Sequence, residues 1–140
     1  AHGRLSDGNQ RNELYVNPYR AMLRTERFNL DLGVSAHWQD YDEDLANGYY
    51  DPENYRRFAL TAVGYWKFSD DDGLSLSVSP GWHTDESLPD YKFGTDVSLE
   101  LINGIYRDWY SRLSASYSDR SQTTGRYDAY AINLSLVRRF

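Results

Sequence analysis

The chain has 140 residues, a formal net charge of −6 and no cysteine. This length suits one domain, and the lack of cysteine excludes a disulfide scaffold and a thiolate-ligated zinc site. The acidic balance argues against nucleic acid as the main partner. The longest stretch without Asp, Glu, Lys or Arg, Gly73 to Thr84, is shorter than the roughly 18 apolar residues of a transmembrane helix. The 13 Tyr, 4 Trp and 5 Phe favour strands over helices.

Apolar residues alternate with small or polar ones along seven segments, and this period of two predicts strands with one apolar face. The first segment, Arg11 to Leu23, is less regular. Its Pro18 lacks a ladder donor, so we expect a local irregularity there. The other predicted strands are Phe28 to Trp38, Phe58 to Phe68, Leu74 to Trp82, Phe93 to Leu101, Trp109 to Ser118 and Tyr130 to Phe140.

The connections between these strands differ in length at the two ends of the predicted sheet. Tight turns are expected at Thr25-Glu26, Asp71-Asp72-Gly73 and Arg107-Asp108. Longer polar loops are expected at Asp40 to Asn54, Thr84 to Asp90 and Asp119 to Arg126. Antiparallel hairpins produce such an order directly. Because neither an internal repeat nor a linker divides the chain, residues 1–140 are predicted to form one β-barrel domain, or a C-terminal segment of it.

Large aromatic residues lie at both ends of the apolar stripes. Phe28 and Trp38, Phe58 and Phe68, and Tyr130 and Phe140 are ten residues apart in each pair. At about 3.3 Å per residue and a tilt of about 40°, ten residues climb roughly 25 Å, the height of the apolar band of an outer-membrane barrel. The opposite face carries Ser, Gly, Asp, Asn and Tyr instead of the Lys and Glu typical of a soluble surface.

These patterns predict an all-β, up-and-down antiparallel transmembrane β-barrel of a bacterial outer membrane. A soluble ligand-binding barrel of the lipocalin or avidin kind is the alternative, because it also alternates. The two differ in the position of the aromatic side chains, which face lipid in the first and a closed interior in the second. The residues predicted on the lipid face are Phe28, Trp38, Phe58, Trp66, Trp82, Trp109 and Phe140.

The number of strands predicts a partial barrel. The N-terminal segment, Ala1 to Ser6, is shorter than the roughly 9–11 residues with which a strand crosses a membrane. Since every edge of a closed barrel is paired, we expect an edge near Ala1 that pairs with strands outside this sequence. The strands found here, about seven or eight, are then the C-terminal part of a larger barrel.

Three motifs carry a resemblance to a known family: the Ser6-Asp7-Gly8-Asn9 turn, the loop from Asn47 to Tyr55, and the ending from Tyr127 to Phe140. Together they resemble the C-terminal barrels of exopolysaccharide export porins of Gram-negative outer membranes, of the cellulose or poly-N-acetylglucosamine type. The resemblance implies a 16-stranded barrel preceded by periplasmic tetratricopeptide repeats. It also implies passive passage of a secreted polysaccharide, without catalysis or a cofactor. The implied partners are the polysaccharide, membrane lipids and lipopolysaccharide, the repeat domain and an inner-membrane synthase complex.

Two other functions stay open from the sequence: an outer-membrane lipid-modifying enzyme of the deacylase type, and a small structural or adhesin barrel. A deacylase needs a histidine near a serine, and His37 and His83 have Ser35 and Ser79 within reach along their strands. Deacylation of a lipid would need a histidine that faces the lipid, but the phase of the alternation points both histidines to the opposite side. We therefore predict hydrogen-bonded lumen histidines, no catalytic residue and no metal site.

The polar phase also selects the residues that would contact a polymer in the lumen. Charged side chains there can set selectivity, or they can pair with one another and fill space. Tyrosines can stack on sugar rings or fill the lumen. Acidic residues outnumber basic ones, which predicts an acidic wall suited to a neutral or partly cationic polymer. The predicted lumen residues are Asp31, His37, Tyr65, Asp96, Glu100, Tyr110 and Arg112.

The loop from Asp40 to Asn54 is rich in acidic residues. Oxygen ligands of this kind can bind calcium, but their spacing is not that of an EF-hand loop. A solvated acidic loop is therefore the favoured interpretation. The acids are Asp40, Asp42, Glu43, Asp44, Asp51 and Glu53.

Overall fold

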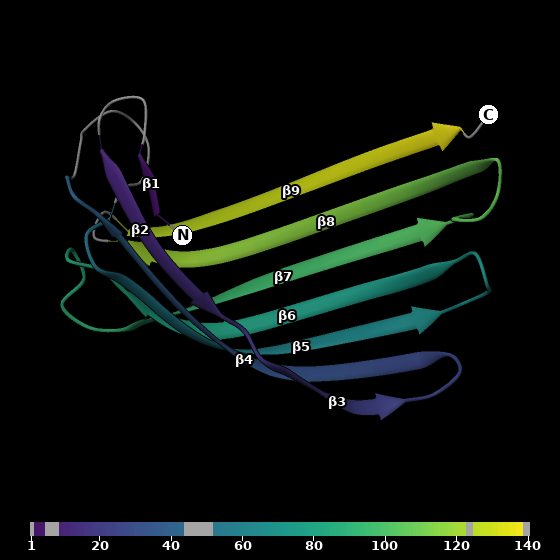
Figure 1. The fold of residues 1–140 in the computed structure, drawn as a ribbon, viewed down its shortest axis with the longest axis horizontal. Coiled ribbons are helices and arrows are strands. Elements are labelled where there is room, and N and C mark those ends of the chain that lie inside the picture. Colours follow the sequence, from purple (N-terminus) through teal and green to yellow (C-terminus); the bar gives the residue numbers. More distant parts are fainter. Residues whose placement is uncertain (1, 5–8, 44–51, 123–124, 139–140) are drawn as a thin grey trace.

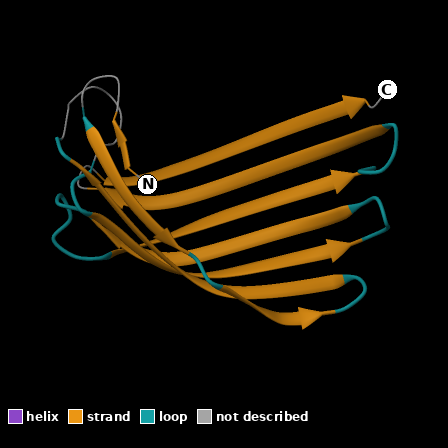
Figure 2. Ribbon diagram, viewed as in Figure 1, coloured by secondary structure: helices purple, strands orange, loops and turns teal. Residues whose placement is uncertain are grey.

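The computed structural model describes residues 2–4, 9–43, 52–122 and 125–138, which form strands joined by turns and loops (Figure 2). Within these residues no helix is long and apolar enough to cross a membrane. All seven predicted strands are present, the first of them divided in two. The strands of the described residues are β1 (His2–Arg4), β2 (Gln10–Val16), β3 (Tyr19–Arg24), β4 (Phe28–Tyr41), β5 (Tyr55–Lys67), β6 (Gly73–Thr84), β7 (Lys92–Asn103), β8 (Trp109–Gln122) and β9 (Gly125–Arg138).

The strands form one antiparallel sheet in the order β1-β2-β4-β5-β6-β7-β8-β9, with β3 also paired to β4. Figure 1 shows this sheet as a curved surface with β9 along one edge and β3 along the other. In the part of the chain that the structure describes, β9 pairs with β8 alone and does not close onto β2 or β3. The described residues therefore form half of an up-and-down barrel that does not close on itself. The pairing of its open edge with strands outside this sequence stays a prediction.

Pro18 separates β2 from β3. Both strands lie end to end along β4, with Val16 opposite Ala36 and Tyr19 opposite Gly33. The Pro18 carbonyl accepts a hydrogen bond from the Val34 N–H at 3.2 Å, but proline has no N–H to return the bond. The irregularity predicted at Pro18 is thus confirmed, and its cause is the missing donor.

The two faces of the sheet have the reverse of the burial found in a soluble protein. In β5, Arg57 and Thr61 are buried, whereas Phe58 and Leu60 on the other face are 51% and 60% exposed. Because side chains crowd together on the inside of a curved sheet, the buried polar phase marks its inner face. A soluble barrel would place the apolar phase inside, so that alternative is wrong. We call the two surfaces the polar face and the apolar face.

Aromatic residues form two rows on the apolar face, one near each end of the strands. Phe58, Trp82 and Phe93 lie in register on β5, β6 and β7, and the Trp82 and Phe93 rings meet edge to face at 5.6 Å. Near the opposite end, the Phe28 and Trp66 rings are 4.5 Å apart. Of the predicted lipid-face residues, all but one lie on the apolar face, and Phe140 is outside the described residues. Those confirmed are Phe28, Trp38, Phe58, Trp66, Trp82 and Trp109.

Two tight turns hold each other at the end of the sheet where β9 also ends (Figure 1), which we call the turn end. The Gly104 N–H donates to the Asp72 carboxylate at 2.8 Å, and the Ile105 N–H donates to the Asp71 carbonyl at 3.0 Å. Arg107 forms ion pairs with the carboxylates of Asp71 at 3.0 Å and Asp72 at 3.4 Å. The β5–β6 and β7–β8 turns therefore act as one unit. The opposite end of the sheet, the loop end, carries the longer connections.

One predicted loop is wrong. The polar run from Asp119 to Arg126 was expected to form a long connection, but β8 and β9 continue through it, with Gln122 opposite Gly125. Serine and threonine are compatible with strands, so polarity alone did not mark a loop here. The N-terminal segment that precedes the seven predicted strands contains the short strand β1, which pairs with β2.

Candidate functional site

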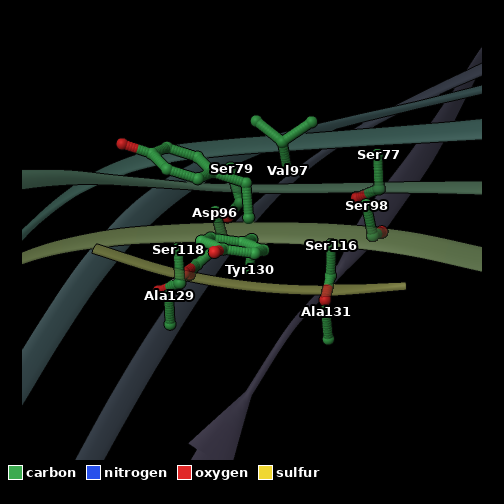
Figure 3. A pocket seen from close by; sticks show the side chains of 11 residues that line it. Ser77, Ser79, Asp96, Val97, Ser98, Ser116, Ser118, Ala129, Tyr130 and Ala131 are labelled. Atoms are coloured by element: carbon green, nitrogen blue, oxygen red, sulfur yellow. The ribbon is translucent and has the colours of Figure 1, made fainter. Parts of the chain in front are cut away.

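The polar face is built from rows of small side chains that run across the strands. One row crosses β6 to β9 as Ser77, Ser98, Ser116 and Ala131. The adjacent row, Ser79, Asp96, Ser118 and Ala129, has the same character. Figure 3 shows Ser116, Ala129 and Ala131 pointing to one side of the sheet and Val97 to the other. Strand alternation thus gives this face short side chains rich in hydroxyl groups.

A hollow of about 280 Å³ lies where these two rows cross the sheet (Figure 3). Residues of both faces line it, among them Ser98 of the polar face and Val97 of the apolar face. Five of its lining residues are serines and two are alanines. The lining comprises Ser77, Ser79, Asp96, Val97, Ser98, Ser116, Tyr117, Ser118, Ala129, Tyr130 and Ala131.

Arg57 organises the centre of the polar face. Its guanidinium reaches from β5 across β6 to Asp96 on β7, at 2.7 Å, and donates to the Ser79 carbonyl at 2.8 Å. The Ser118 hydroxyl on β8 donates to the same Asp96 carboxylate at 2.6 Å. The Arg57 side chain is only 11% exposed. A buried arginine needs such a partner, so this network fixes four strands relative to one another.

The other predicted lumen acids are also paired with arginines. Asp31 forms an ion pair with Arg24 of β3, and Glu100 lies 3.6 Å from Arg112 of β8. With Asp96 held by Arg57, each of the three acids therefore has a cation beside it. The predicted acidic wall is an array of ion pairs instead, so these acids give the polar face no preference for a cationic polymer. The excess of acidic residues lies elsewhere in the chain.

His37 belongs to an aromatic and ionic cluster at the loop end of the polar face. Its Nε2 lies 3.0 Å from the Glu13 carboxylate, and its ring meets those of Tyr15 and Tyr55 edge to face at 5.7 and 5.6 Å. His83 lies next to Tyr55, with ring centres 6.3 Å apart, and is 2% exposed. The cluster ties β2 to β4, β5 and β6. These contacts support the expectation of a structural histidine on the polar face.

The serines considered as partners of a catalytic histidine have other roles. The Ser79 hydroxyl shares a hydrogen bond of 3.0 Å with the Thr61 hydroxyl. Ser35 is buried in the polar phase of β4. Both therefore belong to the lining of the polar face, on the side away from the exposed apolar residues.

The two predicted tyrosines lie on the polar face but in different settings. The Tyr65 ring covers Gly73 of the neighbouring strand so closely that an added Cβ at Gly73 would lie 2.5 Å from the tyrosine hydroxyl. Tyr65 as a whole residue is 39% exposed. Tyr110 lies half-buried opposite Val137 at the turn end. Tyr19 covers Gly33 in the same manner as Tyr65 covers Gly73.

The sequence pattern did not identify the ion-pair partners of three predicted residues. Arg57 pairs with Asp96, Arg24 with Asp31, and Glu13 with His37. Arg57 occupies the polar phase of its strand, and an arginine on the inner face of a barrel needs an acidic partner. The position of Arg57 in the alternation was therefore a signal present in the sequence. Asp44 and Asp51 of the acidic loop lie outside the described residues, and no group of three metal-binding side chains is found in the described part.

The strands form half of an antiparallel barrel with an exposed apolar face, two aromatic rows and a polar inner face. This combination defines a barrel protein of the outer-membrane type. The chain belongs to the family described as cellulose synthase operon protein C C-terminus, whose sequence model matches residues 2–139. This membership confirms the resemblance noted in the sequence.

A solved structure described as a bacterial polysaccharide outer membrane secretin has the same fold. It superimposes with a TM-score of 0.81 at 14% sequence identity, over 96% of this chain. The chain spans about half of that protein's length, 47%. No curated protein sequence matches this chain.

Proposed function

We propose that residues 1–140 form a C-terminal segment of an outer-membrane barrel whose polar face lines the path of a secreted polysaccharide. The observation that carries the proposal is the reversed burial, with serines and paired charges inside and aromatic rows outside. Membership in a family named for the cellulose synthase operon supports a polysaccharide as the substance exported. The apolar face contacts the outer membrane, and the loop end faces the cell exterior.

The lining suits a polymer without net charge. Each predicted lumen acid is balanced by an arginine, so the wall neither concentrates nor repels a charged chain strongly. Serine hydroxyls offer short, exchangeable hydrogen bonds to sugar hydroxyls, and Tyr65 offers one aromatic face. A surface of many weak contacts allows a chain to slide, whereas a few strong ones would hold it.

The larger assembly follows from the same proposal. The open edges at β9 and at β1 and β3 pair with further strands of a barrel of about sixteen. The chain works by passage alone, without a catalytic residue or cofactor. A periplasmic repeat domain and an inner-membrane synthase complex deliver the polymer to it.

The test uses bulky substitutions that narrow the proposed polysaccharide path from the polar face only. In the full-length protein, Ser98→Trp and Ser116→Trp together add two large rings to one row of the polar face. Leu99→Trp and Ala115→Trp place the same rings one position away, on the apolar face. Secreted polymer is measured together with heat-modifiable gel mobility, which reports barrel folding.

We expect the polar-face pair to reduce export several-fold with a folded barrel, and the apolar-face pair to leave export near the unchanged protein. Equal export by both folded variants would contradict a path along the polar face. Loss of export by the apolar-face pair alone would reverse the assignment of the two faces.

A further inference from the structure

A trough lies on the apolar face near the loop end, between the β2–β3 edge and β5. Its volume is about 310 Å³, within the range of small-ligand sites, about 300–1,000 Å³. The register explains it: Val16, Ala36 and Phe58 lie side by side on three strands, and the small Ala36 forms the floor between two larger neighbours. Its apolar-face lining is Val16, Val34, Ala36, Phe58, Leu60 and Trp82. Pro18, between β2 and β3, and two residues of the opposite phase, Ser35 and Ala59, also border it.

The walls of the trough are apolar and open to the surroundings. Val16, Val34 and Leu60 are 51%, 53% and 60% exposed. Trp82 closes one side, and its ring is steadied by Phe93 at 5.6 Å. A surface of this composition and shape fits an acyl chain, because burial of each methylene group is favourable and needs no directional partner.

A cation lies at the loop end of the trough. Arg56 is exposed on the apolar face, one alternation beyond Phe58 and directly opposite Trp38. No carboxylate in the described residues forms an ion pair with it, whereas the next residue, Arg57, is held by Asp96. An arginine on the outer surface of a barrel is tolerated near the membrane interface, where an anion can meet it.

Asn54 holds this arginine in place. Its backbone has a positive φ of 54°, a conformation that asparagine adopts more readily than most residues. The Asn54 Oδ1 accepts hydrogen bonds from the Arg56 Nε at 3.0 Å and from the Trp38 indole N–H at 3.4 Å. The Asn54 N–H in turn donates to the Asp40 carboxylate at 2.7 Å. With Nε engaged, the two terminal nitrogens of the guanidinium remain as a pair of donors for a phosphate.

We propose that this trough and Arg56 form a binding site for a phosphorylated, multiply acylated glycolipid of the outer leaflet, that is, lipid A. One acyl chain lies in the trough, and a phosphate of the headgroup binds Arg56. The assignment rests on the proposed function, which places the loop end at the cell exterior. Charge complementarity selects the headgroup, because the cation lies at the rim and the trough extends from it towards the centre of the apolar face.

The test measures binding of three lipids to the full-length protein in detergent by native mass spectrometry: bisphosphorylated lipid A, the same lipid without phosphates, and phosphatidylethanolamine. The variants are Arg56→Gln, which removes the charge, and Ala36→Phe, which fills the trough. Arg138→Gln is the matched control, because Arg138 also lies on the apolar face but at the turn end, 5.5 Å from the Trp109 ring centre.

Loss of one charge-assisted interaction should weaken binding of bisphosphorylated lipid A to Arg56→Gln by about tenfold. The same variant should bind the dephosphorylated lipid as the unchanged protein does. Ala36→Phe should weaken binding of both, and Arg138→Gln should weaken neither.

Equal binding of bisphosphorylated lipid A by Arg56→Gln and the unchanged protein would overturn the site. Phosphatidylethanolamine could instead bind as tightly as lipid A and be weakened equally by Ala36→Phe. That result would show an acyl groove that does not select the headgroup, and it would overturn the assigned lipid. Insertion into lipid vesicles is measured on the same samples. If the unchanged protein fails to insert, the proposed function is contradicted. If it inserts but does not select lipid A, only this site is contradicted.

Discussion

Replacing Asp96 with asparagine tests whether the polar face is held together by its ion pairs. Asparagine keeps the size of the side chain and can still accept the Ser118 hydrogen bond, but it leaves the Arg57 charge without its counter-ion. Removing one partner of a fully buried pair costs about 3–5 kcal/mol, and an exposed pair contributes about 0–1 kcal/mol. The Arg57 side chain is 11% and Asp96 31% exposed, so the loss falls between these limits, at about 2 kcal/mol.

The matched control is Glu100→Gln. Glu100 and Arg112 are 3.6 Å apart with side chains 39% and 49% exposed, so the expected cost is about 0.5 kcal/mol or less. Both variants are compared by urea unfolding of the full-length protein in vesicles, followed by heat-modifiable electrophoresis. Combining Asp96→Leu with Arg57→Met should recover stability relative to Asp96→Asn, because the unpaired charge is gone.

Equal effects of Asp96→Asn and Glu100→Gln would refute this reasoning. It would mean that water screens the Arg57 guanidinium as well as it screens Arg112, and that the centre of the polar face is not enclosed. A further loss of stability in the double variant would likewise show that the charge itself is well solvated.

Two further predictions concern packing and pH. Gly33→Ala should destabilise the barrel by about 1–3 kcal/mol in urea unfolding, because the new Cβ would lie 2.6 Å from the ring of Tyr19. The control Gly3→Ala should leave stability unchanged, because no atom of the described residues lies within 4 Å of the added Cβ. Hydrogen bonds from the Ser69 hydroxyl and the Gly104 N–H lower the pKa of Asp72 below its ordinary 3.8. The contribution of Asp72 is therefore complete above pH 3.8 and is lost as pH falls through the lowered pKa. The protection factor of the Gly104 amide, its exchange rate relative to the intrinsic rate at the same pH, should fall in that acidic range and should lose this dependence in Asp72→Asn. A protection factor that does not change with pH would contradict the turn contact.

The sequence predicted the faces of the sheet well because they depend on local alternation. Val97 and Leu99 differ in phase from Asp96 and Ser98 in any extended strand, whatever pairs with it. The break at Pro18 was also local, since it follows from a missing N–H. These features required no knowledge of which strands are neighbours.

Contacts across the sheet could not be obtained in this way. The Arg57 guanidinium meets Asp96, 39 positions later, only because β5, β6 and β7 pair in one particular register. Counting charges along the chain therefore predicted an acidic wall where the structure has ion pairs. The continuation of β8 and β9 through the polar run after Asp119 was missed for a related reason, because mutual pairing stabilises strands that composition alone does not mark.

The most direct test of the two faces is a nitroxide scan along β7 in the full-length protein, inserted in vesicles. Single cysteines replace residues 96–102 in turn, in a segment that has no cysteine of its own, after any cysteine elsewhere in the protein is removed. Collision with a water-soluble relaxing agent should be high at Asp96, Ser98 and Glu100, and collision with oxygen dissolved in the lipid should be high at Val97, Leu99 and Leu101. The two profiles are expected to alternate in opposite phase. Reversed phase, or profiles without alternation, would contradict a polar face lining an aqueous path and an apolar face in contact with lipid.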